Sequence, residues 1–363
     1  MHTARPSISG SGTTKMNDRT NIESWVRENI RNLVPYSSAR DEFSGSASVY
    51  LDANESPFPP LNRYPDPGQK ELKEAISSLK GSSPDCLFLG NGSDEGIDLL
   101  IRVLCEPGKD QILTVDPTYG MYAVCARINN VERKSVLLRR DFSLDAESVL
   151  EAVEPNTKLI FICSPNNPTS NAFERKEILK VIDRAGCMVV VDEAYLDFSG
   201  EEGFLSLVPA KKNLVVLQTF SKARGLAGIR LGMLFAHPVL IHYLSSVKYP
   251  YNVSSLTIEK ALEHLRGKSE IERNVQRIVR QRKVLEGELL KMPFIQRVFH
   301  SDANFLLVRL EKPMELYSFL MKRGIIVRDR SKVSLCEGCL RITIGTEEEN
   351  SRLLTALKKY AAE

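Results

Sequence analysis

Short apolar runs alternate with amphipathic segments along most of the first 250 or so residues of the chain. The runs are rich in leucine or β-branched residues, and turn residues bound them. Nearly continuous apolar strands of this kind are expected where helices cover both faces of a mostly parallel sheet. The runs lie at 86–90, 111–115, 158–163, 187–195, 214–220 and 231–236. The pattern therefore predicts an α/β fold built from strand–helix–strand units.

The pattern changes after about residue 250. A long charged amphipathic segment at 269–292 predicts an exposed helix that links two bodies. Beyond it, strand-like runs and helical segments alternate up to a closing helix, which predicts a second, smaller α+β domain. The expected strands lie at 303–310, 325–329 and 340–345, and the expected helices at 314–324 and 347–362.

These patterns predict four parts. Residues 1–20 are small and polar, without an apolar core segment, and are expected to be a disordered lead or an expression remnant. An N-terminal arm follows over 21–55, then a large domain over 56–255, and then the small C-terminal domain over 256–363. The expected fold is thus a helix-covered, mostly parallel sheet joined to a smaller domain.

Composition narrows the function classes. Lysine and arginine number 49 against 46 acidic residues, so the net charge of +3 gives no field for nucleic acid or for a membrane surface. No apolar run reaches the roughly 18 residues that a membrane helix needs. The seven cysteines follow no disulfide framework, which favours reduced thiols and a cytoplasmic location. Cys336 and Cys339 form a lone CxxC and the five histidines lack ligand spacing, so no metal is expected.

The segment GNGSDEG at 90–96 joins a predicted strand to a predicted helix at 93–104, with Ser93 as the expected N-cap. Its last glycine stands one residue too far along for the dinucleotide-binding fingerprint. Glycines still let the backbone approach a ligand closely, and free N–H groups at a helix start bind anions. The segment predicts a phosphate site, with a simple glycine turn as the alternative.

Polar residues follow two of the buried strands. The segment SPNNPTS at 164–170 is a proline-pinned turn, and VVVDEAYLDF at 189–198 ends a buried strand in Asp192, Glu193 and Tyr195. Buried carboxylates are costly unless they are paired or hydrogen-bonded, so at least one of them needs a partner. The open alternatives are an ordinary turn and an ion pair with a surface arginine.

The segment TFSKARGLAGIRLG at 219–232 places Lys222 and Arg230 in one loop of small residues. A solvated surface loop is one interpretation. The other is a pyridoxal phosphate site, in which the amine forms a Schiff base with the aldehyde, a carboxylate partners the pyridine nitrogen, and helix N–H groups with an arginine hold the phosphate. The order of the polar residues favours the second: Asn167, Asp192, Tyr195, Lys222, Arg230.

From about residue 22 to the C-terminus, the chain resembles the fold-type I pyridoxal-phosphate aminotransferases and, within them, the histidinol-phosphate aminotransferases. The long ordered set of matching segments is LVPYSSAR, LDANESPF, NRYPDP, GNGSDEGIDLLIR, DPTYGMY, SPNNPTS, VVDEAYLDF, TFSKARGLAGIRLG, GIIVRD and CLRITIGT.

The resemblance implies roles around the cofactor ring. Lys222 would be the Schiff-base lysine and the base that moves a proton between the substrate Cα and the cofactor C4′. Asp192 would hold the pyridinium proton, and Tyr119 would stack on the ring face. Asn167 and Tyr195 would hydrogen-bond the phenolic oxygen of the ring.

For the cofactor phosphate, the resemblance implies binding by Ser93 and Asp94, mainly through their backbone N–H groups, together with Ser221 and Arg230. In such enzymes the site lies between two subunits, and Tyr64 would reach the phosphate bound by the partner. A homodimer with shared sites is therefore expected.

For the substrates, Arg341 resembles the arginine that grips the carboxylate of glutamate or 2-oxoglutarate. Arg328, with Tyr36 and Asn54 from the N-terminal arm, would complete a pocket for the phosphate of an amino-alcohol phosphate. One cationic site could then serve two unlike substrates in turn.

The expected reaction is transamination between L-histidinol phosphate and 2-oxoglutarate, giving imidazole-acetol phosphate and glutamate in histidine biosynthesis. An aromatic or general aminotransferase and an O-phosphothreonine decarboxylase of the same fold are the alternatives. A pyridoxal-phosphate-fold domain of a transcription regulator is disfavoured, because no helix-turn-helix pattern precedes the fold. Two departures from the family are notable: Ser170 stands where the family usually has glycine, and RGLAG at 224–228 replaces a segment after the lysine that more often contains an aromatic residue.

Overall fold

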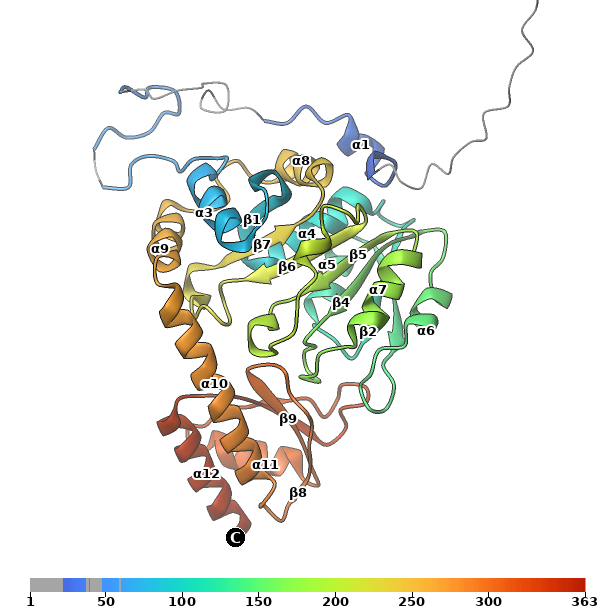
Figure 1. Ribbon diagram of the computed structural model, residues 1–363, viewed down its shortest axis with the longest axis vertical. Helices are drawn as coiled ribbons and strands as arrows, with labels where there is room; N and C mark the ends of the chain where they lie inside the picture. The colour runs from blue at the N-terminus through green and yellow to red at the C-terminus, as the bar shows by residue number, and fades with distance from the viewer. Residues whose placement is uncertain (1–21, 37–38, 40–47, 59, 363) are drawn as a thin grey trace, which may run out of the picture.

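The computed structural model describes residues 22–36, 39, 48–58 and 60–362, and the expected lead over 1–20 lies outside them. A seven-stranded sheet forms the centre of the larger part of the molecule (Figure 1). Its order is β1-β7-β6-β5-β4-β2-β3; β3, β2, β4, β5 and β6 run parallel, whereas β7 runs antiparallel to both its neighbours. The strands are β1 (Leu87–Asn91), β2 (Gln111–Asp116), β3 (Glu132–Leu137), β4 (Thr157–Cys163), β5 (Met188–Asp192), β6 (Leu214–Thr219) and β7 (Leu231–Phe235).

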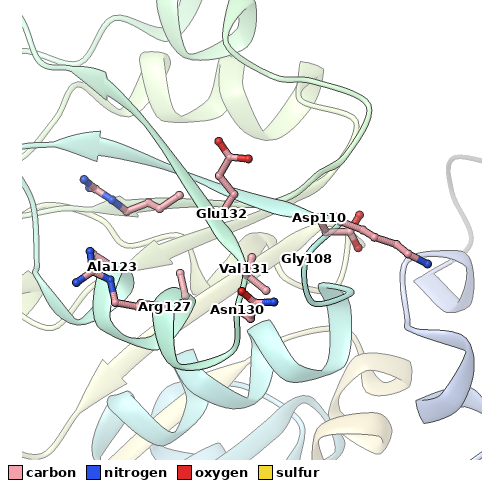
Figure 2. A pocket seen from close by; sticks show the side chains of 10 residues that line it. Gly108, Asp110, Ala123, Arg127, Asn130, Val131 and Glu132 are labelled. Atoms are coloured by element: carbon pink, nitrogen blue, oxygen red, sulfur yellow. The ribbon is translucent and has the colours of Figure 1, made fainter.

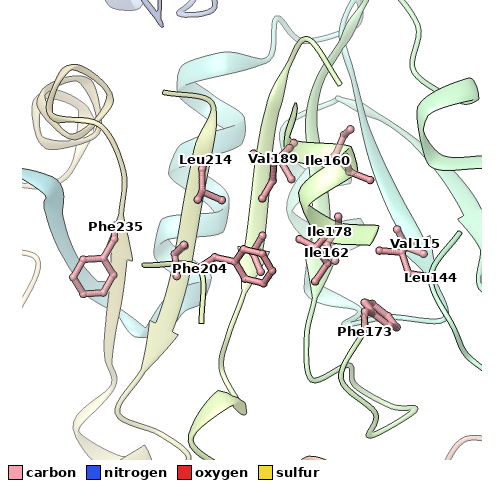
Figure 3. Close-up of a cluster of buried hydrophobic side chains, with 14 of the residues drawn as sticks. Val115, Leu144, Ile160, Ile162, Phe173, Ile178, Val189, Phe204, Leu214 and Phe235 are labelled. Carbon is pink, nitrogen blue, oxygen red and sulfur yellow. The ribbon is translucent and has the colours of Figure 1, made fainter. Parts of the chain in front are cut away.

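Helices cover both faces of this sheet. Side chains alternate along each strand, so in β5 Val189 and Val191 join one core cluster whereas Met188 and Val190 join another. The first cluster packs under α3 (Lys70–Lys80), α6 (Ala146–Glu151), α7 (Arg175–Arg184) and α9 (Ser255–Leu265) (Figure 3). The second packs under α4 (Gly92–Leu104), α5 (Met121–Ile128) and α8 (Pro238–Val247). This two-sided burial explains why the central strands β4, β5 and β6 consist mostly of apolar residues.

A long helix, α10 (Lys268–Leu289), runs from the large sheet to a four-stranded antiparallel sheet of order β10-β11-β9-β8 (Figure 1). One face of the small sheet packs against α10, α11 (Pro313–Met321) and α12 (Glu347–Ala362). Leu307 and Cys339, on its other face, join the core of the large sheet. The small sheet therefore turns one face toward the large one. Its strands are β8 (Ile295–Val298), β9 (Phe305–Leu310), β10 (Arg328–Asp329) and β11 (Cys339–Thr343).

Short elements complete the chain. A four-residue helix, α1 (Glu28–Arg31), lies near the start of the described chain and packs against α8. The 3₁₀ turns are η2 (Ile22–Ser24), η3 (Pro84–Cys86), η4 (Leu196–Phe198), η5 (Leu205–Leu207) and η6 (Ala227–Ile229). Over the described ranges, every helix is too short or too polar to cross a bilayer.

The predicted fold class is confirmed, with differences in detail. Strands β3 and β8 were not predicted, because each lies at a sheet edge and carries exposed polar side chains, so neither forms an apolar run. Ser93 as the N-cap of α4 was wrong: the helix begins at Gly92 after Asn91, whose backbone N–H donates to the Glu95 side chain. The proposed domain boundaries stay predictions.

Candidate active site

One pocket collects residues from the carboxyl ends of β4, β5 and β6 and from the start of α4. Carboxyl ends of parallel strands are where open α/β sheets place their ligands. Nine of the predicted site residues line it: Ser93, Asp94, Tyr119, Asn167, Asp192, Tyr195, Ser221, Lys222 and Arg230. The lining also contains Gly92, Cys163, Ala194, Thr219 and Ala227, which the motifs had not singled out.

Asp192 lies at the end of β5 and is only 2% exposed. Its carboxylate accepts hydrogen bonds from the Tyr122 hydroxyl at 2.7 Å and from the Ala194 backbone N–H at 3.1 Å. Burial raises the pKa of the Asp192 carboxyl, and these two bonds oppose that rise. No lysine, arginine or histidine in the described ranges forms an ion pair with it. The carboxylate is therefore suited to a cationic N–H donor that enters the pocket.

Tyr122 is a residue that the sequence reasoning missed. It is fully buried in α5, and its ring stacks on Phe161 of β4 with centroids 4.6 Å apart. Sequence spacing gave no signal for it, because Tyr119 of DPTYGMY lines the pocket but precedes α5, which begins at Met121. The Tyr122 hydroxyl donates to one oxygen of Asp192, so Tyr122 supports a pocket residue without lining the pocket itself.

The Lys222 amine lies 5.6 Å from the centre of the Tyr195 ring. Burial lowers the pKa of this amine, and the positive charge of Arg341 lowers it further. A lowered pKa increases the neutral, nucleophilic fraction of a lysine at a given pH. The pocket therefore prepares Lys222 for attack on a carbonyl group.

Asn167 connects the pocket to the small sheet. Its side-chain amide donates to the Tyr195 hydroxyl at 3.4 Å, and its side-chain oxygen accepts from Arg341 Nη1 at 2.5 Å. Arg341 lies in β11, and its guanidinium also lies 5.2 Å from the Phe305 ring. An arginine that is 174 residues away in sequence thus reaches the pocket edge through a single asparagine.

The start of α4 forms the other end of the pocket. Gly232 of β7 permits the approach, because a Cβ there would lie 2.1 Å from the carbonyl carbon of Gly92. Arg230 has left-handed backbone angles (φ 54°) and places Nη2 2.7 Å from where a Gly92 Cβ would stand. Its guanidinium lies 3.5 Å from Ser221 Oγ and 3.7 Å from Asp94 Oδ2. Since the first N–H groups of a helix lack partners within it, these groups together suit an anion.

The remaining predicted residues lie away from this pocket in the single chain. Asn54 and Tyr64 line a separate pocket with Tyr251, on which Tyr64 stacks with centroids 4.3 Å apart. Tyr36 is 73% exposed, and Arg328 is exposed directly across the β10–β11 ladder from Arg341. Their expected roles stay predictions.

A further polar pocket lies at the amino ends of β2 and β3 (Figure 2). Its lining includes Asp110, whose carboxylate accepts from the Glu106 backbone N–H at 2.7 Å, and Arg133, which pairs with Asp116 at 2.7 Å. These charges are already satisfied, and the pocket opens at the end of the strands opposite to Lys222. It is therefore a poor candidate for the reaction site.

The chain belongs to the class I and II aminotransferase family, whose profile matches residues 32–357. Within this family, it is 54% identical to a histidinol-phosphate aminotransferase of Parabacteroides distasonis over 93% of this chain and 98% of the relative. It is 52% identical to a histidinol-phosphate aminotransferase of Bacteroides fragilis over 93% and 99% of the two chains.

Solved structures agree with the fold. The histidinol-phosphate aminotransferase of Clostridium acetobutylicum superposes with a TM-score of 0.77 at 27% identity, over 83% of this chain and 91% of that one. The enzyme of the same name from Sinorhizobium meliloti, solved in complex with pyridoxal-5'-phosphate, has a TM-score of 0.76 at 22% identity, over 85% and 89% of the two chains. The fold-type I architecture expected from the motifs is confirmed.

Proposed function

We propose that this protein is a pyridoxal-phosphate-dependent aminotransferase that converts L-histidinol phosphate and 2-oxoglutarate to imidazole-acetol phosphate and glutamate, in histidine biosynthesis. The observation that carries the proposal is the buried Asp192 carboxylate, which has no ion-pair partner among the described residues and shares a pocket with Lys222. The relatives named histidinol-phosphate aminotransferase, at 54% and 52% identity, support the choice of substrate.

The pocket fits pyridoxal phosphate at three points. Asp192 offers a carboxylate for a protonated pyridine nitrogen, and Lys222 offers an amine of lowered pKa for the aldehyde. The start of α4 at Gly92, with Arg230 beside it, offers a cradle for the phosphate. When bound, the cofactor withdraws electrons from the bonds at the substrate Cα, a chemistry that no side chain supplies.

The side chains of the pocket would have distinct roles in the reaction. Lys222 Nζ would take the proton from the substrate Cα and deliver it at the cofactor C4′, and the ionised Asp192 would keep the ring nitrogen protonated. Tyr119 would lie against the ring, and Asn167 and Tyr195 would hold its phenolic oxygen. The bond between Asn167 and Tyr195 already orients both side chains for that task.

Ser93, Asp94, Ser221 and Arg230 hold the phosphate of the cofactor, the first two through their backbone N–H groups. The substrate anion lies at the other end of the pocket. Arg341 receives the carboxylate of glutamate or 2-oxoglutarate, because its planar fork matches two carboxylate oxygens.

Arg328, Tyr36 and Asn54 complete the site for the phosphate of histidinol phosphate. A cationic site can accept either anion, which is what an enzyme that alternates between two unlike substrates requires.

We further propose that two chains form a dimer with shared active sites and that the enzyme works in the cytoplasm. Large apolar side chains are exposed in the arm before Tyr64 and just before Tyr251, the residue on which Tyr64 stacks: Val34 87%, Leu51 91%, Phe58 77% and Tyr249 80%. A second chain would cover them, and Tyr64 would then reach the phosphate bound by the partner. Light scattering on the purified protein tests the dimer.

The test of the reaction is an amino-donor screen with 2-oxoglutarate as acceptor. We expect glutamate to form with L-histidinol phosphate faster than with phenylalanine, tyrosine or aspartate. A clear preference for an aromatic amino acid would reassign the enzyme to a general aminotransferase. Release of carbon dioxide from O-phosphothreonine without any keto acid would reject transamination.

A further inference from the structure

Arg330 lies beside the two arginines already placed at the substrate end of the pocket. Arg328 and Arg341 are directly opposite each other in the β10–β11 ladder, and the Arg330 backbone N–H donates to the Cys339 carbonyl at 2.9 Å. Directly opposed residues, and residues two apart in an extended segment, share a face of the sheet. The three guanidinium groups therefore project from one face.

That face of the small sheet looks toward the large one. Leu307, opposite Arg341 in the β9–β11 ladder, belongs to the core of the large sheet. Arg341 itself donates to Asn167 of the pocket lining. Arg330 thus lies on the face that meets the reaction site, at its substrate end.

The three arginines have no carboxylate partner among the described residues, although Arg341 donates a hydrogen bond to Asn167. In the described chain, neither Arg330 nor Arg341 forms an ion pair, and the Nε atoms of both are buried without a hydrogen-bond partner. The sequence neighbour Asp329 accepts instead from the Ser331 backbone N–H at 2.8 Å and from its hydroxyl at 2.6 Å. Burial lowers the pKa of Arg330, and the charges of Arg341 and Arg328 lower it further.

Buried donors without a partner and like charges placed face to face are both costly. A site of this kind is stabilised when an anion enters it. A carboxylate carries one negative charge and two acceptor oxygens, which a single arginine fork satisfies. A phosphate monoester carries about 1.5–2 negative charges at neutral pH and has three free oxygens. Three converging arginines match the second anion better than the first.

We propose that Arg330 is a third cation of the substrate-anion site and makes that site prefer a phosphate group to a carboxylate group. The inference rests on the proposed function, in which the phosphate of the amino substrate and a carboxylate of the acceptor occupy this site in turn. Arg330 acts as a specificity-determining residue, whereas Arg341 serves both anions.

The test is calorimetric titration of the cofactor-loaded enzyme with inorganic phosphate and, separately, with 2-oxoglutarate. Without an amino donor neither ligand is turned over. The variants are Arg330→Gln and, as a control that removes the same charge from an exposed helix, Arg352→Gln. Arg330→Met, which keeps an unbranched stem, is a second variant for the case in which the glutamine variant does not fold.

Coulomb energy scales with the charge of the group beside the cation, so loss of one cation changes the logarithm of affinity about twice as much for a phosphate dianion as for the single carboxylate group of 2-oxoglutarate that enters the site. We expect Arg330→Gln to weaken phosphate binding roughly tenfold and 2-oxoglutarate binding roughly threefold. The Arg352→Gln control should leave both affinities unchanged. Equal losses for the two ligands, or no loss for phosphate, would overturn the assignment.

The two hypotheses fail in different ways. If the unmodified enzyme does not turn over L-histidinol phosphate, the proposed reaction fails, yet the ratio of the two affinities still reports on Arg330. If turnover is observed and the ratio is the same in Arg330→Gln as in the unmodified enzyme, the role of Arg330 fails and the reaction stands.

Discussion

Replacing Tyr122 with phenylalanine removes one hydroxyl from behind the active site and little else. The phenylalanine ring keeps the stacking on Phe161, with centroids 4.6 Å apart, and the edge contact with Tyr119 at 5.6 Å. What disappears is the 2.7 Å hydrogen bond to Asp192, which leaves the Ala194 backbone N–H as the remaining protein donor. The hydroxyl also interacts with the Cys163 thiol, so the variant removes its contacts to Asp192 and to Cys163 and leaves the ring packing in place.

A hydrogen bond to a charged group contributes about 1.5–3 kcal/mol. The bond favours the ionised form of Asp192, and the ionised form is the one that pairs with a protonated pyridine nitrogen. We therefore expect Tyr122→Phe to raise the dissociation constant of pyridoxal phosphate by roughly ten- to a hundredfold.

The direction of the pH effect follows from the same bond. Without the hydroxyl, the pKa of Asp192 rises further above its usual range, so the carboxyl keeps its proton to a higher pH. The acid side of the cofactor-binding profile should then move to higher pH in Tyr122→Phe.

The assay is titration of cofactor-free enzyme with pyridoxal phosphate, followed by visible absorbance between pH 5.5 and about 8.5, a range that brackets neutral pH. Tyr360→Phe is the matched control, because its hydroxyl contacts Glu315 in the small domain and not the pocket. An unchanged affinity together with an unchanged pH profile would refute the role given to Tyr122.

Other variants test other parts of the site. Arg341→Ala removes the guanidinium group and leaves the Asn167 side-chain oxygen without its donor. The Michaelis constant for 2-oxoglutarate should therefore rise by an amount equivalent to about 2–5 kcal/mol. An unchanged Michaelis constant would mean that the carboxylate site lies elsewhere. Burial raises the pKa of Asp192 in the folded state, so its contribution to stability is complete below the unfolded pKa of about 3.9 and is lost as the pH rises through the folded pKa. Cofactor-free Asp192→Asn should therefore lose less thermal stability than the unmodified protein between acid and neutral pH, and equal losses in melting scans would contradict this.

The parts of the fold that the sequence predicts well are those buried on both sides. The central strands β4, β5 and β6 are predicted from the apolar runs LIFIC, MVVV and LVVL, which are buried because helices cover both faces of the sheet. The edge strands β3 and β8 escape prediction because edge residues face water and carry polar side chains.

The site residues likewise divide into those that the sequence predicts and those that it does not. Residues in local motifs at strand ends, such as Asn167 and Lys222, come together because parallel strands end at one edge. Tyr122 and Arg330 could not be assigned from the sequence, since their significance lies in contacts: a bond across 70 residues in one case and unpartnered atoms in the other.

The sequence indicated that Ser170 is unusual, but it did not indicate which contact the side chain makes. Its backbone is left-handed, with φ 71°, a conformation that glycine adopts more readily than serine. Its hydroxyl donates to the His300 carbonyl at 2.8 Å, an interaction that glycine could not make and that no motif foretells.

Covalent attachment of the cofactor to Lys222 is the central feature of the proposed mechanism. Borohydride reduction of the cofactor-loaded enzyme, followed by proteolysis and mass spectrometry of the peptides, measures that attachment directly. We predict that the peptide containing Lys222 carries the pyridoxyl label and that Lys222→Ala carries none and lacks the visible absorption band. A label on any other lysine, or an unlabelled Lys222 in the loaded enzyme, would contradict the account.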